Sequence, residues 1–373
     1  MTERFLLALT NAFVLLIILM IHIITPKTTR RNILFGVKVP ERVMEHGEII
    51  DLRKSFTRYN LLIGIPALLL LSFLVYRFPH SLFVTMATFI YLGLLFLIYL
   101  RFNYKVKELK KEKGWGKDAE KIVLIDIKYS RDKSKIGNIP PLWFLLPLIL
   151  IIFNFILGIV LYPTLPDQIP THWNFRGEIT SYRDKSYGTV LMLPAMQLFM
   201  LGLFYFSNWS IGRTKQEIDP KNPEESLRKN IIFRRAWSIY LYVITILTIL
   251  LFTFLNLLIY GIFETNRPIN IFAGILVAFS IIGGTILSLK VGQGGERLRL
   301  KDHEATKRDI GREDDHLWKL GNTIYYNPED SSIFVEKRYG VGWTVNAGRP
   351  LGILILMLPF IVLIITLIIT ERL

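Results

Sequence analysis

The chain has 373 residues, of which 51% are hydrophobic and only 20% are charged. By length alone the chain could hold two or three soluble domains. Its apolar residues, however, gather into runs of about 20, which are long enough to cross a bilayer core as helices. The absence of cysteine excludes disulfides, thiolate metal sites and cysteine nucleophiles. In a membrane protein, the net charge of +15 predicts basic cytoplasmic loops and no nucleic-acid partner.

The apolar runs predict an all-α multi-pass membrane protein with about eight transmembrane helices and a small cytoplasmic β unit. The first run lacks a basic leader and a cleavage site of small residues, so we expect a retained span. The predicted spans are 5–25, 59–76, 81–100, 142–161, 188–206, 236–260, 269–289 and 351–370.

Changes in composition divide the chain into six segments. They are a three-span membrane region at 1–100, a basic loop at 101–140, a two-span region at 141–206 with a loop at 162–187, a basic loop with two further spans at 207–290, a β-containing module at 291–349 and the last span at 350–373.

The distribution of lysine and arginine predicts the orientation in the membrane. Four strongly basic connections alternate with weakly charged ones along the chain, and basic loops stay in the cytoplasm. We therefore expect both termini and the loop at 162–187 to be extracytoplasmic. The connections expected in the cytoplasm are 26–58, 101–140, 208–235 and 290–349.

Within the last polar connection, the runs at 323–327, 333–338 and 339–346 have the composition of short strands separated by turns. A β unit this small is only marginally stable by itself. We therefore expect it to pair with a short strand predicted at 122–127 or to dock onto the helices. A histidine-containing run of mixed charge at 301–316 lacks the spacing of a zinc site, and no metal is expected.

The predicted spans contain almost no ionisable side chains, which argues against an ion-coupled transporter. Their amides, at Asn11, Asn154, Gln197 and Asn256, are expected to hydrogen-bond between helices. Neither a serine–histidine arrangement nor a His-Glu-x-x-His motif is present, so we expect no catalytic residues and no cofactor.

The loop at 162–187 is the most distinctive polar stretch. Pro163, Pro166 and Pro170 fix φ and remove hydrogen-bond donors, which predicts an ordered turn structure with neither a helix nor a ladder. One interpretation is a binding surface for an outside ligand, and the other is a membrane-edge loop anchored by aromatic residues. The residues of the predicted binding surface are Asp167, His172, Trp173, Asn174, Arg176, Gly177 and Glu178.

The run LPDQIPTHWNFRGE at 165–178 resembles the signature of the SdpI-related family of bacterial toxin-immunity and signalling membrane proteins. The segment at 314–350 resembles a second, uncharacterised module, and NILFGVKVPE at 32–41 resembles an element of the wider family. SdpI itself is smaller and lacks the C-terminal module, so the resemblance implies a class of protein and no particular toxin.

The resemblance implies a non-enzymatic membrane protein for envelope defence or signalling. Its expected partners are the lipids of the cytoplasmic membrane, an extracellular peptide toxin or envelope ligand, and a cytoplasmic regulator. The alternative is a transporter or flippase for an amphipathic molecule, using the spans that carry Asn and Pro. A membrane enzyme ranks third because the sequence lacks a catalytic constellation.

The orientation can be tested by cysteine labelling, because the chain has no native cysteine. Cysteines introduced at Ser81 and Ser181 are expected to react with an impermeant thiol reagent on intact cells, whereas one at Ser134 is not. Labelling at Ser134 would reverse the predicted orientation.

Overall fold

The computed structural model describes residues 3–115, 137–173, 178–218, 222–263, 265, 267–298 and 314–371. The chain forms two compact units, described separately below. Unit 1 comprises Met1–Asp132, Arg213–Asn230 and Ser288–Leu373, and unit 2 comprises Lys133–Gly212 and Ile231–Leu287.

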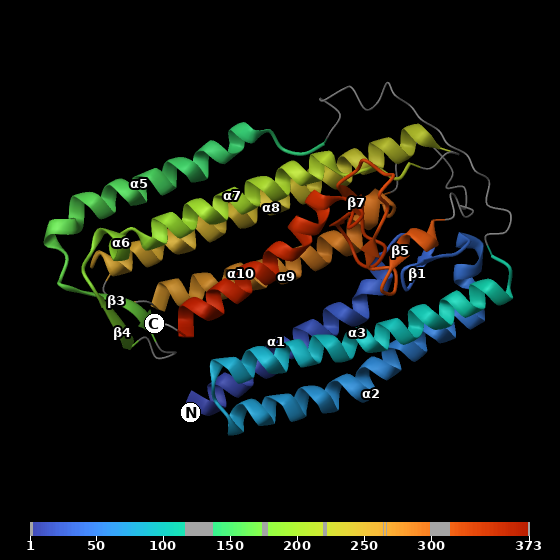
Figure 1. The fold of residues 1–373 in the computed structure, drawn as a ribbon, viewed down its shortest axis with the longest axis horizontal. Coiled ribbons are helices and arrows are strands. Elements are labelled where there is room, and N and C mark those ends of the chain that lie inside the picture. The colour runs from blue at the N-terminus through green and yellow to red at the C-terminus, as the bar shows by residue number, and fades with distance from the viewer. Residues whose placement is uncertain are drawn as a thin grey trace. The chain divides into compact units, whose positions relative to one another are not determined.

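Every predicted apolar run is helical over most of its length, because a helix satisfies its own backbone hydrogen bonds in an apolar surrounding. The long helices are α1 (Glu3–Thr28), α2 (Gly47–Arg77), α3 (Ser81–Glu112), α5 (Leu145–Leu161), α7 (Met192–Arg213), α8 (Pro223–Ile259), α9 (Arg267–Val291) and α10 (Pro350–Glu371) (Figure 1). Short helices are η1 (Glu41–Glu45), η3 (Pro141–Phe144), η4 (Tyr162–Thr164), α6 (Tyr187–Val190), η5 (Gln293–Gly295) and η6 (Asp315–Leu317).

Six helical stretches in the described part of the chain are long and apolar enough to cross a membrane. They correspond to α1, α2, α3, η3 with α5, α8, and α9. The chain is therefore a multi-pass membrane protein. The other two predicted spans, 188–206 and 351–370, coincide largely with α7 and α10.

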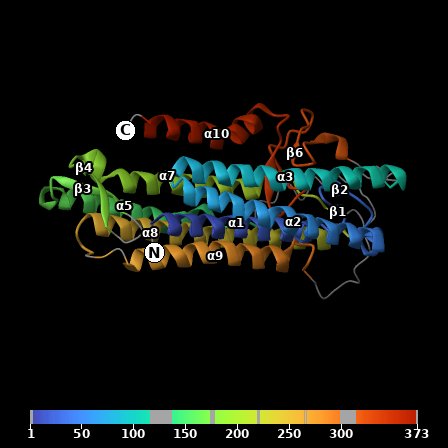
Figure 2. The same ribbon diagram turned by 90° about the horizontal axis from the view of Figure 1, so that it is seen from below.

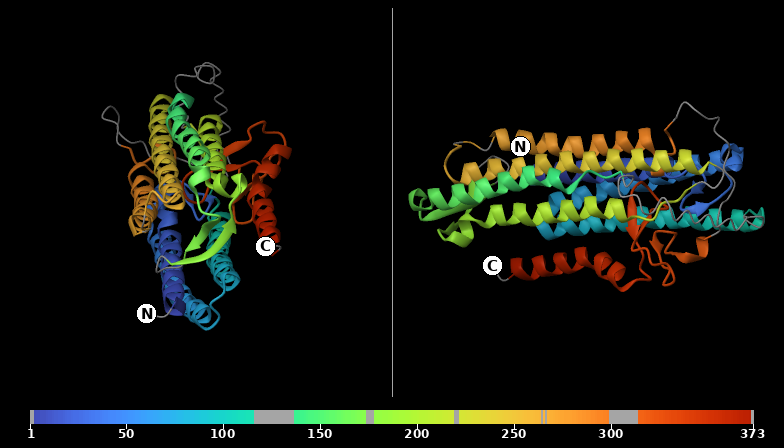
Figure 3. Two further views of the ribbon diagram at one scale, coloured as in Figure 1. Left: turned by 90° about the vertical axis from the view of Figure 1, so that its left-hand side faces the viewer. Right: turned by 90° about the horizontal axis from the view of Figure 1, so that it is seen from above.

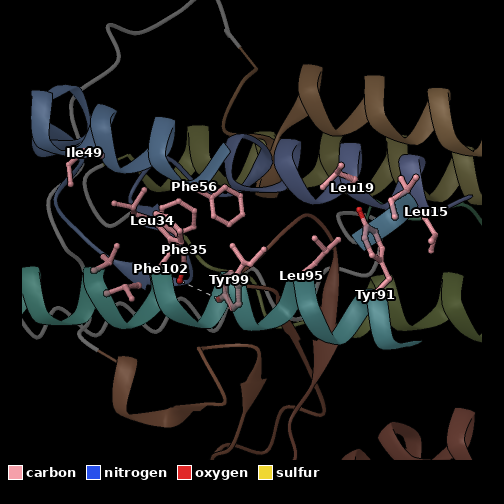
Figure 4. Packing of buried hydrophobic residues seen from close by; sticks show 14 of the residues in the cluster. Leu15, Leu19, Leu34, Phe35, Ile49, Phe56, Tyr91, Leu95, Tyr99 and Phe102 are labelled. Atoms are coloured by element: carbon pink, nitrogen blue, oxygen red, sulfur yellow. Dashed lines mark hydrogen bonds between the residues drawn. The ribbon is translucent and has the colours of Figure 1, made fainter. Parts of the chain in front are cut away.

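In unit 1, α1, α2 and α3 pack side by side (Figure 2). The short connection between Arg77 and Ser81 turns α3 back along α2, as the sequence predicted. Aromatic rings fill one end of this bundle (Figure 4). The Phe56 ring lies 4.8 Å from that of Phe35 and 5.2 Å from that of Phe102, between ring centroids.

Phe35 belongs to a tight hairpin between β1 (Ile33–Leu34) and β2 (Val37–Lys38). Its two-residue turn has positive φ at both Phe35 and Gly36, which matches the twist of the paired strands. A Cβ at Gly36 would lie 2.5 Å from the Tyr99 hydroxyl, so the close approach requires glycine there.

A second left-handed turn joins β5 (Trp318–Lys319) to β6 (Ile324–Tyr325). Leu320, Gly321 and Asn322 all have positive φ, which is rare for residues with a side chain. The Asn322 amide donates to the Gly36 carbonyl at 2.9 Å, so the two left-handed turns contact each other.

Two side chains of α3, Tyr99 and Asn103, bind both turns. Asn103 Nδ2 donates to the carbonyls of Phe35 at 2.7 Å and Gly321 at 3.1 Å, and the Tyr99 hydroxyl also donates to both. The β-containing segment is thus docked onto the helices, as predicted. The possible strand at 122–127 lies outside the described residues.

In unit 1, the strands β7 (Phe334–Glu336) and β8 (Trp343–Val345) also form an antiparallel pair. The three predicted strands therefore correspond to β6, β7 and β8, whereas no strand was predicted at the position of β5. Asn346 holds the loop that precedes β7, because its side-chain amide donates to the carbonyls of Asn327, Asp330 and Ser332.

The Arg30 guanidinium is deeply buried in unit 1, with only 4% of the side chain exposed. It lies 2.5 Å from the Glu336 carboxylate, 3.0 Å from that of Glu296 and 3.5 Å from that of Glu217. Burial alone would lower the pKa of Arg30, but these three carboxylates outweigh burial and raise it. The guanidinium is therefore a permanent cation that joins three separate segments.

A second ion cluster adjoins the first through Glu217. Lys38 Nζ lies 2.9 Å from both the Glu217 and the Asp314 carboxylates, and Arg338 pairs with Asp314 and Asp315. Burial opposes the charge on Lys38, yet the paired carboxylates raise its pKa. Basic residues of the connections expected in the cytoplasm at 26–58 and 290–349 are thus buried here, because acidic residues from distant segments neutralise them.

Replacing Arg30 tests whether the ion cluster holds unit 1 together. Arg30→Met removes the cation that pairs with the nearly buried Glu296 and Glu336 carboxylates, so we expect a loss of about 3–5 kcal/mol in unfolding free energy. The matched control is Arg31→Met: its side chain is 51% exposed and lies 3.7 Å from Glu41, so a loss of about 1 kcal/mol or less is expected. The measurement is denaturant unfolding of the purified variants. If both variants lose the same unfolding free energy, the Arg30 ion cluster does not hold unit 1 together.

Candidate functional site

The proline-rich loop folds as a β-hairpin, which corrects the prediction of a turn structure without a ladder (Figure 3). Strand β3 (Gln168–Trp173) pairs antiparallel with β4 (Ile179–Asp184). Pro170 lies opposite Tyr182, and the register shifts directly after it. A two-stranded ribbon tolerates this proline because each strand keeps an unpaired edge where no donor is needed.

The base of the hairpin is held by aromatic and lysine contacts. The rings of Tyr162 and Tyr187 stack in parallel with centroids 4.0 Å apart. Lys185 Nζ donates to the Leu165 carbonyl at 2.6 Å and lies 5.5 Å from the centroid of the Tyr162 ring. These contacts join the residues before β3 to those after β4, so the orientation of the hairpin is fixed at its base.

At the base of the hairpin, a buried cluster is formed by Leu165, Ile169, Val190 and Tyr260. The Tyr260 hydroxyl donates to the Val190 carbonyl at 3.2 Å. The hydroxyl also packs against Gly158 of α5, where an added Cβ would lie 2.6 Å away. The hairpin is therefore rooted on α5, α6 and the end of α8.

Neutral polar side chains connect α5, α7 and α8. Asn154 Nδ2 donates to Gln197 Oε1 at 3.0 Å and to Thr253 Oγ1 at 2.8 Å. Asn256 Nδ2 also donates to Gln197 Oε1, at 3.3 Å, and Gln197 Nε2 donates to the Ile249 carbonyl at 2.9 Å. All three amide side chains are fully buried. The predicted interhelical role of Asn154, Gln197 and Asn256 is confirmed.

A cavity of about 690 Å³ lies beside the hairpin within unit 2. Thr171, His172 and Trp173 of β3 form one wall, and the helices supply mostly aliphatic side chains for the others. An apolar cavity of this size with a few polar groups suits an amphipathic ligand. The helical residues of the lining are Thr189, Met192, Leu193, Leu255, Leu258, Ile259, Ile269 and Asn270.

The predicted site residues separate into three groups. His172 and Trp173 line the cavity, and the His172 ring nitrogen lies 3.3 Å from the Thr171 hydroxyl. Asp167 and Glu178 are exposed and are not part of the lining. The other three predicted site residues, Asn174, Arg176 and Gly177, lie outside the described residues.

The helical walls of the cavity escaped sequence reasoning. Leu193, Leu255 and Leu258 look like any other aliphatic residues of an apolar run, and only tertiary packing brings them beside His172. Within the described part of the chain, no group of His, Asp and Glu side chains is arranged to hold a metal ion.

Two stretches of the chain match known families. Residues 149–198 match a domain of unknown function (DUF1648), and residues 328–353 match a family of unknown function (DUF5808). The first match contains the hairpin, Asn154 and Gln197, and the second contains β7, β8 and the start of α10. No curated protein and no solved structure matches the chain.

The amide network can be tested at Gln197. Gln197→Ala removes the acceptor shared by Asn154 and Asn256, and we expect it to lower stability by about 1–2 kcal/mol. Gln168→Ala is the matched control, since it deletes an exposed amide whose side chain bonds Asp184 among the described residues, and a change within about 0.5 kcal/mol is expected. If unfolding of the purified variants gives equal losses, the network does not support the helices.

Proposed function

We propose that the chain is a non-enzymatic protein of the bacterial cell membrane that binds a peptide toxin or another amphipathic envelope ligand. The observation that carries the proposal is the cavity between the hairpin and the helices, because it joins an apolar interior to the polar edge at His172. The residues predicted from sequence as a binding surface include two that line it, His172 and Trp173.

The chemistry of the cavity defines the kind of ligand. Aliphatic walls favour an acyl chain or the apolar face of a peptide, whereas His172 and Thr171 offer hydrogen bonds to its polar part. Stacked tyrosines and Lys185 hold the base of the hairpin. The hairpin therefore loses less conformational freedom on binding a ligand than a flexible loop would lose.

The proposed topology has eight spans, with α7 and α10 crossing the membrane in addition to the six apolar helices. The charge pattern then places the hairpin outside, and the ion clusters of unit 1 in the cytoplasm. In this arrangement the protein meets its ligand at the outer surface and a regulator at the inner one. The resemblance of 165–178 to the SdpI-related family supports immunity or signalling as the outcome.

A transporter or flippase for an amphipathic molecule is the second candidate, favoured by the apolar lining that three helices contribute to the cavity. A transporter moves its ligand across the membrane, whereas an immunity or signalling protein only binds it. Reconstituted protein that moves a fluorescent lipid or peptide between leaflets faster than empty vesicles would favour the transporter.

The binding proposal predicts a specific effect of changes at the hairpin. His172→Ala is expected to weaken protection or signalling by about tenfold or more with an unchanged amount of protein in the membrane, because the side chain is exposed. Asn174→Ala is expected to act in the same way, and Pro166→Ala more weakly. The assay compares these variants in a deletion strain challenged with envelope-active peptides.

Arg183→Ala is the matched control, since Arg183 is exposed on the paired strand and does not line the cavity. The anchoring interpretation expects a different pattern, in which Trp173→Ala and Tyr162→Ala lower the amount of protein in the membrane. Wild-type behaviour of His172→Ala in both protection and abundance would refute the binding site.

A further inference from the structure

A second cavity, of about 440 Å³, lies in unit 1 at the end of α3. It is lined by residues from two segments about 200 positions apart in the chain, with Lys107, Lys110, Lys111 and Trp115 on one side and Asp315 and His316 on the other. The proposed function of the hairpin does not use this cavity.

The end of α3 is shaped to form this wall. Gly114 has a φ of 68°, and its N–H donates to the Lys111 carbonyl at 3.3 Å, while the Trp115 N–H donates to the Lys110 carbonyl at 3.0 Å. This pair of bonds is a Schellman motif, which ends the helix and folds the next residue back. Trp115 therefore lies beside the lysines of the last turns and packs against the core.

The lining carries more positive than negative charge. Its one carboxylate, Asp315, is already shared by Lys110 at 2.7 Å and by the buried Arg338. Lys107 is half-buried, and neither it nor Lys111 makes an ion pair with any residue that the structure describes. Asp315 attracts the Lys107 ammonium, whereas Arg338, Lys110 and Lys319 all lie close enough to repel it.

We propose that this cavity binds a small soluble anion that carries phosphate groups, such as a nucleoside di- or triphosphate. Lysine ammonium groups are favourable partners for phosphate oxygens, and a multiply charged anion would relieve the repulsion among the lysines. The Trp115 ring supplies an apolar wall for the uncharged part of the ligand.

The distance from the membrane favours a soluble ligand over a lipid headgroup. The apolar part of α3 ends at Leu100, and Lys110 lies ten residues further on, about 15 Å along the helix. The headgroup layer extends only about 5–8 Å beyond the hydrocarbon core. A phosphate attached to embedded acyl chains would therefore stop short of the cavity.

The test is titration calorimetry of the full-length protein with sodium pyrophosphate and with ATP, in nanodiscs of pure phosphatidylcholine. Saturable binding is expected, and Lys107→Met combined with Lys111→Met is expected to weaken it by about tenfold or more, because two charge-assisted contacts are lost. Lys105→Met is the matched control on the same helix, since Lys105 is exposed and does not line the cavity.

Lys107→Arg keeps the charge and is expected to retain binding, which separates loss of charge from loss of folding. Absence of saturable binding of both probes, or equal affinity in the wild type and the double Met variant, would overturn the proposal. The lipid alternative is tested in nanodiscs of phosphatidylglycerol. If these abolish pyrophosphate binding at the same ionic strength, a lipid headgroup occupies the cavity and the soluble ligand is wrong.

Discussion

A guanidinium that is 4% exposed cannot be left without counter-charges, and unit 1 is arranged around this requirement at Arg30. Its partners Glu217, Glu296 and Glu336 come from segments that follow α7, follow α9 and form β7. Transferring an ion from water into the protein interior costs several kcal/mol, and the attraction of the three carboxylates offsets that cost. The ion cluster therefore specifies which segments must meet, whereas the aromatic core of α1, α2 and α3 supplies apolar burial.

In unit 2, neutral amides connect the helices on which the hairpin is rooted. Asn154, Gln197 and Asn256 satisfy one another between helices, since neutral amides are less costly than ions in an apolar surrounding. Unit 1 also uses amides, since Asn103 and Asn322 bind the two left-handed turns, but it adds the Arg30 ion cluster. The amide network holds the helices on which the hairpin is rooted.

The helices were predictable because hydrophobicity is a local property of the chain. Their ends were less so: α2 begins at Gly47 and α8 at Pro223, well before the apolar runs, because polar residues there continue the helices. The hairpin was missed because Pro170 argued against a strand, and only the two-stranded pairing makes that proline acceptable.

The candidate site was predictable only in part. His172 and Trp173 were recognisable from a short run of unusual residue types, whereas the leucines beside them come together through tertiary packing. The ion clusters were invisible for the same reason. Composition marked Lys38 as a basic loop residue, but its carboxylate partners lie far along the chain.

The Arg30 cluster also has a consequence for biosynthesis. Glu336 follows Arg30 by 306 residues, so at about 5–20 residues per second the ribosome needs on the order of 15–60 seconds to supply this carboxylate. Until then Arg30 lacks its closest partner, and a chain truncated before β7 never acquires it. A quality-control protease would therefore meet an accessible segment around Arg30 in truncated chains, whereas in the complete chain the same segment is held by its pairing with β7.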